Sequence, residues 1–118
     1  MAEKIEVFPN PHTTRDYHVE HQAQEFTSLC PMTGQPDVAT ITIRYVPGPT
    51  CIELKSLKLY LQSFRSKGVF YEDATNLILN ALVAACSPKW MVVESRWNVR
   101  GGIQNVIRAE HGDRNLRT

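Results

Sequence analysis

The sequence predicts an α+β domain in which an antiparallel sheet carries two helices on one face. Apolar and polar residues alternate from Ala39 to Tyr45 and again from Trp90 to Trp97, as they do in half-buried strands. Between these segments, two consecutive runs show apolar residues at helical spacing. Strands that flank a contiguous pair of helices favour a four-stranded sheet that is covered on one side only.

The first part of the chain predicts little regular structure. Residues 1–24 are polar, contain two prolines and carry His12, His18 and His21, so we expect an irregular N-terminal arm. These histidines lack a Cys or carboxylate at ligand spacing, which favours a solvated arm over a metal site. After the strand at 39–45, Pro47-Gly48-Pro49 turns the chain, and residues 51–53 read as a second, short strand.

The two helices have clear ends. The first is expected to end at Ser66-Lys67-Gly68, and the second is stopped by Pro88. Their apolar faces are formed by Leu54, Leu57, Leu61 and Phe64, and by Ala74, Leu77, Ile78, Ala81, Leu82 and Ala85. After the strand at 90–97, Arg100-Gly101-Gly102 breaks the run, and residues 103–109 predict the last strand. Residues 112–118 read as a frayed polar tail.

Length and composition bound the class of protein. A chain of 118 residues predicts a single domain, residues 1–118. A net charge of +1 gives no pull toward nucleic acid or membrane, and an odd count of three cysteines favours a reducing compartment. The first residues lack an apolar signal region, and no run reaches membrane length. We therefore expect a cytoplasmic protein.

A sheet with helices on one face only leaves its other face bare and both of its edges open. Small chains commonly solve this problem by assembly, in which the sheets of several copies close into a barrel. The sequence therefore predicts a homo-oligomer with sites between subunits.

The stretch from Cys30 to Asp37 predicts chemistry. A thiol and a carboxylate lie seven residues apart across a loop that Pro31, Gly34 and Pro36 restrict, so a nucleophile and an acid could be presented together. The alternative is a buried loop cysteine and a turn aspartate, since such pairs also occur by accident.

A basic arc, Lys55, Lys58 and Arg65, lies along the first predicted helix. Glu53 stands at the positive end of that helix, and Lys55 and Ser56 in its first turn could donate to a phosphate. Together with Arg100, the arc indicates a site for an anionic cofactor. The alternative is an ordinary solvated helix face.

Four blocks of this sequence resemble the family of NADPH-dependent 7-cyano-7-deazaguanine reductases, the nitrile reductases of queuosine biosynthesis. They are the Cys30–Asp37 stretch, Glu53-Leu54-Lys55-Ser56-Leu57-Lys58-Leu59-Tyr60, Phe70-Tyr71-Glu72-Asp73 and Arg100-Gly101-Gly102-Ile103. The resemblance implies the tunnelling fold, in which small α+β subunits form a barrel, and an assembly of two stacked pentamers. It also implies NADPH as the cofactor, and the lack of ligand partners around the histidines and cysteines predicts no metal site.

The resemblance implies a role for each matching residue. Cys30 would add to the nitrile carbon as a thioimide, Asp37 would protonate the nitrile nitrogen, and Glu72 would hold the deazaguanine base. The substrate would also meet residues beside Glu72 and at the start of the first helix: Tyr71, Ile52, Glu53 and Leu54. The cofactor would be held by Lys55, Ser56, Lys58, Tyr60 and Arg100.

One departure from the family pattern is Tyr71, because the family commonly has His immediately before the base-binding Glu.

Other possible functions of the chain differ from nitrile reduction in their chemistry. An archaeosine-synthase-like enzyme would transfer ammonia to a nitrile in tRNA, but such proteins are expected to lose the cofactor motif at 53–60. A purine- or pterin-binding oligomer would need neither Cys30 nor Asp37. A zinc cyclohydrolase would need ligand partners that Cys51 and Cys86 lack.

Overall fold

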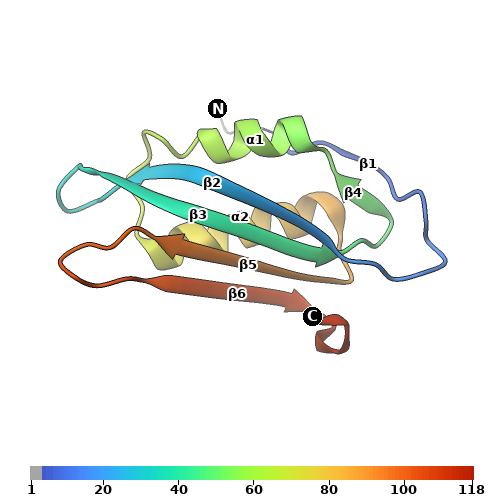
Figure 1. Ribbon diagram of the computed structural model, residues 1–118. Coiled ribbons are helices and arrows are strands. Elements are labelled where there is room, and N and C mark those ends of the chain that lie inside the picture. Colours follow the sequence, from blue (N-terminus) through green and yellow to red (C-terminus); the bar gives the residue numbers. More distant parts are fainter. Residues whose placement is uncertain (1–3) are drawn as a thin grey trace.

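A computed structural model describes residues 4–118, and it confirms the predicted α+β fold class (Figure 1). The main sheet is antiparallel, in the order β2-β3-β5-β6. Its strands are β2 (Val19–Leu29), β3 (Pro36–Val46), β5 (Trp90–Trp97) and β6 (Val106–Gly112). The helices α1 (Leu54–Gln62) and α2 (Tyr71–Cys86) lie on the same side of this sheet. No helix in the described part of the chain is long and apolar enough to cross a membrane.

The core lies between that face of the sheet and the two helices. Alternation places every second residue of the central strands β3 and β5 on the helix side, where Ile41, Ile43 and Val93 are buried. The helices contribute Leu57 and Ile78 to the same core. The other face is charged and is crossed by ion pairs between neighbouring strands, such as Arg44–Glu20 and Arg108–Glu94. The sheet is therefore one-sided, as the sequence predicts.

The expectation of an irregular arm at residues 1–24 is only partly correct. Residues 10–18 form no helix or strand, but the described segments on either side contain β1 (Val7–Pro9) and the first part of β2, an edge strand of the main sheet. The pairing of β2 with β3 shifts between Ala23 and Phe26, which marks a β-bulge. A bulge moves later side chains to the opposite phase of the alternation, so no continuous period-2 pattern is visible in the sequence.

Two further expectations need correction. The short strand near residues 51–53 exists as β4 (Thr50–Ile52), but it pairs with β1 in a separate two-stranded sheet. The tail is ordered, because β6 extends to Gly112 and a 3₁₀ helix follows at Arg114–Leu116. Arg117 Nε donates to Glu110 at 2.7 Å, and this contact fixes the tail to the charged face of the sheet.

Candidate active site

A pocket of about 370 Å³ lies where three loops meet at one end of the sheet. The β2–β3 hairpin, the start of α2 and the turn between β5 and β6 each contribute to it. Its lining residues are Cys30, Pro31, Thr33, Gln35, Asp37, Val69, Phe70, Tyr71, Glu72 and Arg100. Five residues that the sequence analysis selected, from three separate blocks, therefore share one pocket.

Cys30 lies at the start of a tight loop that follows β2. Its N–H donates to the Gln35 carbonyl at 2.8 Å, and its carbonyl accepts the Gly34 N–H at 2.8 Å. Gly34 has a φ of +73°, a conformation that favours glycine. The side-chain hydroxyl of Thr33 lowers the pKa of the Cys30 thiol, with further help from the N–H groups of Thr33 and Met32. The loop therefore presents a thiol that ionises more readily than an ordinary cysteine.

Asp37 lies on β3 opposite Ser28, and only 6% of it is exposed. Its Oδ1 is 3.5 Å from Nη2 of Arg100, which also donates to the Pro36 carbonyl. Arg100 reaches this position from a tight turn in which it exchanges backbone hydrogen bonds with Ile103. Arg100 is therefore the ion-pair partner of the proposed acid, a contact that the sequence did not predict.

Tyr71 and Glu72 form the first turn of α2 at the pocket. The Tyr71 ring stacks on Trp97, with centroids 3.9 Å apart and planes 10° from parallel. Burial, followed by the nearby Asp37 carboxylate, raises the pKa of Tyr71, so this residue stays a neutral phenol at physiological pH. Glu72 is exposed, and its carboxylate makes no hydrogen bond or ion pair with any of residues 4–118. The Glu72 carboxylate, which the sequence analysis predicts to hold the base, is thus available to a ligand.

The start of α1 is arranged differently. The Glu53 carboxylate accepts the backbone N–H groups of Lys55 at 2.7 Å and Ser56 at 2.8 Å, and these bonds lower the pKa of Glu53. The position of Glu53 at the positive end of the helix is as the sequence predicts. However, the same bonds occupy the two backbone N–H groups that were expected to donate to a phosphate, which leaves the exposed Lys55 side chain as the donor in this turn.

Other members of the Ile52–Tyr60 block are also engaged within the chain. Ile52 is buried, and its N–H donates to the Tyr45 hydroxyl at 2.9 Å. Ser56 is buried and its hydroxyl accepts the Glu6 N–H at 2.8 Å. Tyr60 packs in the core, where burial raises its pKa to about 12. These side chains stabilise the fold and face no pocket described here.

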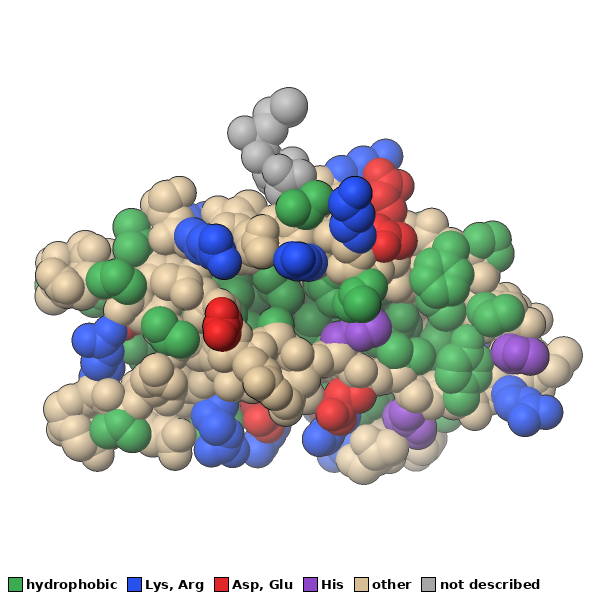
Figure 2. All heavy atoms as spheres, turned by 45° about the horizontal axis from the view of Figure 1, so that its top comes forward, with side chains coloured by type: hydrophobic (Ala, Val, Ile, Leu, Met, Phe, Trp, Pro, Cys, Tyr) green, Lys and Arg blue, Asp and Glu red, His purple; other side chains and the backbone are tan. Residues whose placement is uncertain are grey.

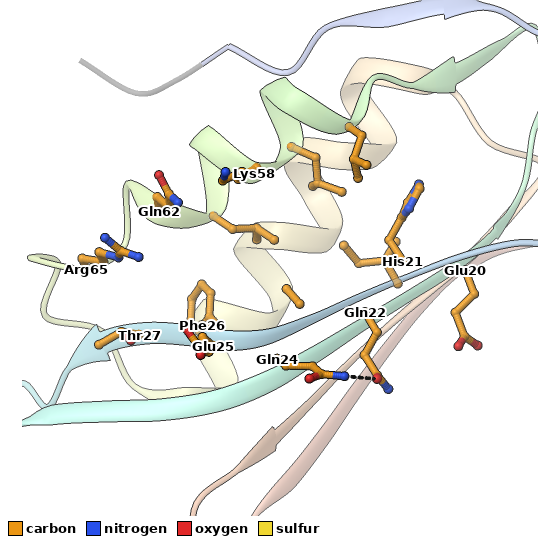
Figure 3. A pocket seen from close by; sticks show the side chains of 15 residues that line it. Glu20, His21, Gln22, Gln24, Glu25, Phe26, Thr27, Lys58, Gln62 and Arg65 are labelled. Atoms are coloured by element: carbon orange, nitrogen blue, oxygen red, sulfur yellow. Dashed lines mark hydrogen bonds between the residues drawn. The ribbon is translucent and has the colours of Figure 1, made fainter.

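Leu54 and Lys58 line a second, larger groove of about 610 Å³ between α1 and β2 (Figure 3). Lys58, Gln62 and Arg65 project along one wall of this groove, and His21 projects from β2. Figure 2 shows basic side chains over α1 and apolar surface in the hollow below them. The groove and the Cys30 pocket share no lining residue, although Thr27 at the end of the groove lies only three residues before Cys30.

Sequence reasoning missed Thr33, Gln35 and Trp97 as parts of the site. Thr33 follows Cys30 by three residues within the loop already selected, so the spacing of a hydroxyl to a thiol was the available signal. Trp97 gave no such signal, because it reads as one more apolar residue of an alternating strand.

The sequence of the chain matches one family model and several curated relatives. The model of a family described as "QueF-like protein" matches residues 36–116. An NADPH-dependent 7-cyano-7-deazaguanine reductase of Chlorobaculum parvum is 57% identical over 105 residues, covering 89% of this chain and 90% of the relative. Proteins of the same name from Anaeromyxobacter sp. (strain K) and Rhodopirellula baltica are 54% and 51% identical and cover 93% and 96% of this chain and 90% and 93% of their own length.

One solved structure, described as an archaeosine synthase QueF-Like in the apo form, matches with a TM-score of 0.72. The match covers 83% of this chain and 94% of that chain, at 19% sequence identity. At this identity the match supports the fold alone.

Proposed function

Because the chain belongs to the QueF-like family together with the NADPH-dependent 7-cyano-7-deazaguanine reductases, we propose that it reduces the nitrile of 7-cyano-7-deazaguanine to an aminomethyl group. The observation that carries the proposal is the shared pocket of Cys30, Asp37 and Glu72. A nitrile on a guanine-like base needs a nucleophile, an acid and an acceptor for its N–H groups. Cys30 has a lowered pKa, Asp37 is buried, and the Glu72 carboxylate is unpaired among residues 4–118.

In the proposed reaction, Asp37 takes up the proton of the Cys30 thiol, the resulting thiolate adds to the nitrile carbon, and Asp37 passes the proton to the nitrogen to give a thioimide. Two molecules of NADPH would supply the two hydrides, one to the thioimide carbon and one to the carbon of the imine that remains after the C–S bond breaks and the Cys30 thiolate leaves. Cys30 is thereby regenerated, and the net change is the addition of two hydrides and two protons to one C≡N bond. Covalent addition helps because a free nitrile is a poor hydride acceptor.

Glu72 is proposed to hold the base. The guanine-like edge of the substrate presents N–H donors, and a carboxylate accepts such bonds about twice as strongly as a neutral group. Glu72 supplies this acceptor from the first turn of α2, unpaired among the described residues and directed to the pocket that contains Cys30. Tyr71 and its stacking partner Trp97 would form the wall beside it.

We propose the groove beside α1 as the site for the phosphates of NADPH. Its exposed cations, Lys58 and Arg65, and its apolar floor suit a ligand with charged and aromatic parts. Thr27 and Cys30 are three residues apart, or roughly 10 Å along an extended chain. An elongated dinucleotide could therefore be held in the groove and reach Cys30. We propose Lys55, Lys58 and Arg65 as its cationic contacts, with Arg100 at the pocket end.

The contact of Leu54 with substrate, which the family resemblance implies, needs a second copy of the chain, because Leu54 lies in the groove and not in the Cys30 pocket. Leu54 is 61% exposed, and the sheet ends in two edge strands, β2 and β6. Both features support the proposed homo-oligomer of stacked pentamers with sites between copies. Light scattering coupled to size-exclusion chromatography measures its mass; a monomer would contradict the assembly.

The direct test of the proposed function follows NADPH absorbance after the purified protein is mixed with 7-cyano-7-deazaguanine. We expect two NADPH to be consumed for each nitrile reduced to amine. Consumption of the nitrile with ammonia and without NADPH would instead indicate the amidine-forming chemistry of an archaeosine synthase. Absence of any turnover, with the substrate still bound, would favour a binding protein.

A further inference from the structure

A chain of buried polar groups lies behind the Tyr71 side of the Cys30 pocket. Trp97 Nε1 donates to Ser95 Oγ at 2.9 Å, and Ser95 Oγ lies 2.6 Å from Thr75 Oγ1. Thr75 Oγ1 in turn donates to the Tyr71 carbonyl at 2.8 Å. Ser95 and Thr75 are completely buried, and Trp97 is 1% exposed. Because water does not reach these groups, their hydrogen bonds must be made inside the protein.

The direction of each bond follows from the groups that form it. An indole N–H only donates, and a carbonyl only accepts. The Thr75 hydroxyl gives its one proton to the Tyr71 carbonyl, so the Thr75 oxygen must accept the proton of Ser95. The Ser95 oxygen in turn accepts the Trp97 N–H. A side chain without a hydroxyl at position 75 or 95 would therefore interrupt the chain of bonds.

This chain of bonds connects the main sheet to the side of the pocket that α2 forms. Ser95 and Trp97 lie on β5, and Thr75 lies one turn after Tyr71 in α2. At one end, the bond to Ser95 fixes how the Trp97 ring, on which Tyr71 stacks, is turned. At the other end, Thr75 holds the Tyr71 backbone. Both ends therefore act on Tyr71, which lines the pocket beside Glu72.

We propose that Ser95 and Thr75 are positioning residues that hold the Tyr71 ring and the Glu72 carboxylate in place for the base of the substrate. The use made of this order by the base rests on the proposed function, whereas the contacts that fix Tyr71 do not depend on it. A purely structural role predicts a different result, because apolar side chains of the same shape could pack α2 on the sheet equally well. A hydroxyl bond fixes an orientation, whereas a methyl group only fills space.

The first test separates the hydroxyl of Thr75 from its shape. Thr75→Val removes the hydroxyl and keeps the volume. We expect its dissociation constant for 7-cyano-7-deazaguanine, measured by calorimetry without NADPH, to rise about threefold to tenfold, as for one lost hydrogen bond. Thr75→Ser keeps the hydroxyl and removes a methyl group. It should lower the Tm through the small cavity that it leaves, but it should retain the wild-type affinity.

A second measurement needs no ligand. In the proton–nitrogen correlation spectrum of the free protein, the Trp97 indole signal should shift in Thr75→Val, because Ser95 loses its acceptor. In Thr75→Ser the signal should return to the wild-type position. A wild-type protein that does not bind the nitrile would contradict the proposed function, and the Trp97 signal would still decide whether the two hydroxyls orient the indole.

The matched control is Thr50→Val. Thr50 Oγ1 donates to the Cys86 carbonyl at 2.9 Å, so this substitution removes the same kind of bond at the last residue of α2, at the end away from the pocket. It should lower the Tm and leave both the affinity and the Trp97 signal unchanged. In a protein that binds the nitrile, unchanged affinity in Thr75→Val would overturn the proposal. An unmoved Trp97 signal in Thr75→Val, or an equal loss of affinity in Thr50→Val or Thr75→Ser, would also overturn it.

Discussion

The starts of the two helices use similar residues in opposite ways. At α1, the Glu53 carboxylate accepts two N–H groups of its own first turn. At α2, Phe70 gives no side-chain cap, and Glu72 in the first turn is unpaired among the described residues. Uncapped N–H groups and the positive end of a helix favour negative charge nearby. One acidic residue therefore closes a helix end, while the other is left for a ligand beside Cys30.

This difference shows how a motif residue with a structural role can be distinguished from one that is available to a ligand. Both carboxylates belong to blocks that resemble the same enzyme family, so the sequence alone gives them equal standing. What distinguishes them is whether their oxygens already have partners. By this criterion we propose the Cys30 pocket as the reactive region, whereas α1 would contact a cofactor mainly through the exposed cations that follow its first turn.

The strongest test of this comparison removes Cys30, the proposed nucleophile of the pocket at the start of α2. With Cys30→Ala, we expect the covalent adduct with 7-cyano-7-deazaguanine to disappear, as measured by intact-protein mass spectrometry without NADPH. Cys86→Ala should keep the adduct, because burial raises the pKa of Cys86 to about 12 and keeps this thiol un-ionised. An adduct that survives in Cys30→Ala would place the chemistry elsewhere.

Glu72→Gln tests the free carboxylate. The amide replaces one acceptor by a donor that must face a substrate N–H, which should cost about 1–3 kcal/mol, or roughly fivefold to 150-fold in affinity. Calorimetric titration with the nitrile measures this loss. Thermal stability should hardly change, since Glu72 caps nothing in the described structure. A stable variant with wild-type affinity would refute the base clamp.

Lys58→Ala tests the groove beside α1. Loss of one charged contact to a phosphate should cost about 1.5–3 kcal/mol and raise the KM for NADPH by about tenfold to a hundredfold. Formation of the thioimide should remain normal, because Lys58 lies outside the Cys30 pocket. The matched control is Lys89→Ala, whose amine pairs with Asp16 at 2.7 Å. Equal loss of adduct in Lys58→Ala would argue against a separate cofactor groove.

Glu53→Gln should have the smallest effect of these substitutions. It should lower the thermal stability of the protein and leave its affinity for ligands unchanged. We expect its Tm at neutral pH to fall by about 2–5 °C, as for a weakened helix cap. The folded state lowers the pKa of Glu53, so its carboxylate adds stability above the unfolded pKa of about 4.3. That contribution is lost as the pH falls through the lower, folded pKa. Thermal melts should therefore show the two proteins converging in acid; a difference that persists there would contradict the cap.

Secondary structure could be predicted from the sequence wherever a single periodicity of apolar residues runs through the whole element. The prediction failed where an irregularity interrupts that periodicity. The central strands and both helices fit their periods, so β3, β5, α1 and α2 were found. The bulge in β2 after Ala23 divides that strand into two short phases, and neither is long enough to distinguish a strand from a polar arm. Periodicity also says nothing of partners, which is why the pairing of β4 with β1 was missed.

The site was predictable to the extent that its parts are local in sequence. Cys30 and Asp37 lie in one hairpin, and their loop residues indicate chemistry without any knowledge of the fold. The pairing of Arg100 with Asp37 depends instead on a turn between β5 and β6 that lies 63 residues further along the chain. Such a contact follows from the strand order of the sheet, in which β3 and β5 are neighbours. The sequence predicted an antiparallel sheet but not this order.

The stack of Tyr71 on Trp97 also makes the pocket visible to light. The chain has two tryptophans, and the other, Trp90, lies at the opposite end of β5, roughly 23 Å away along an extended strand. Trp90 donates its indole N–H to Glu110 on the charged face of the sheet, away from Tyr71. A ligand that shifts the Tyr71 ring changes the surroundings of one indole and leaves the other as an internal reference. The intrinsic emission of the protein is therefore a built-in optical reporter of whether its pocket is filled.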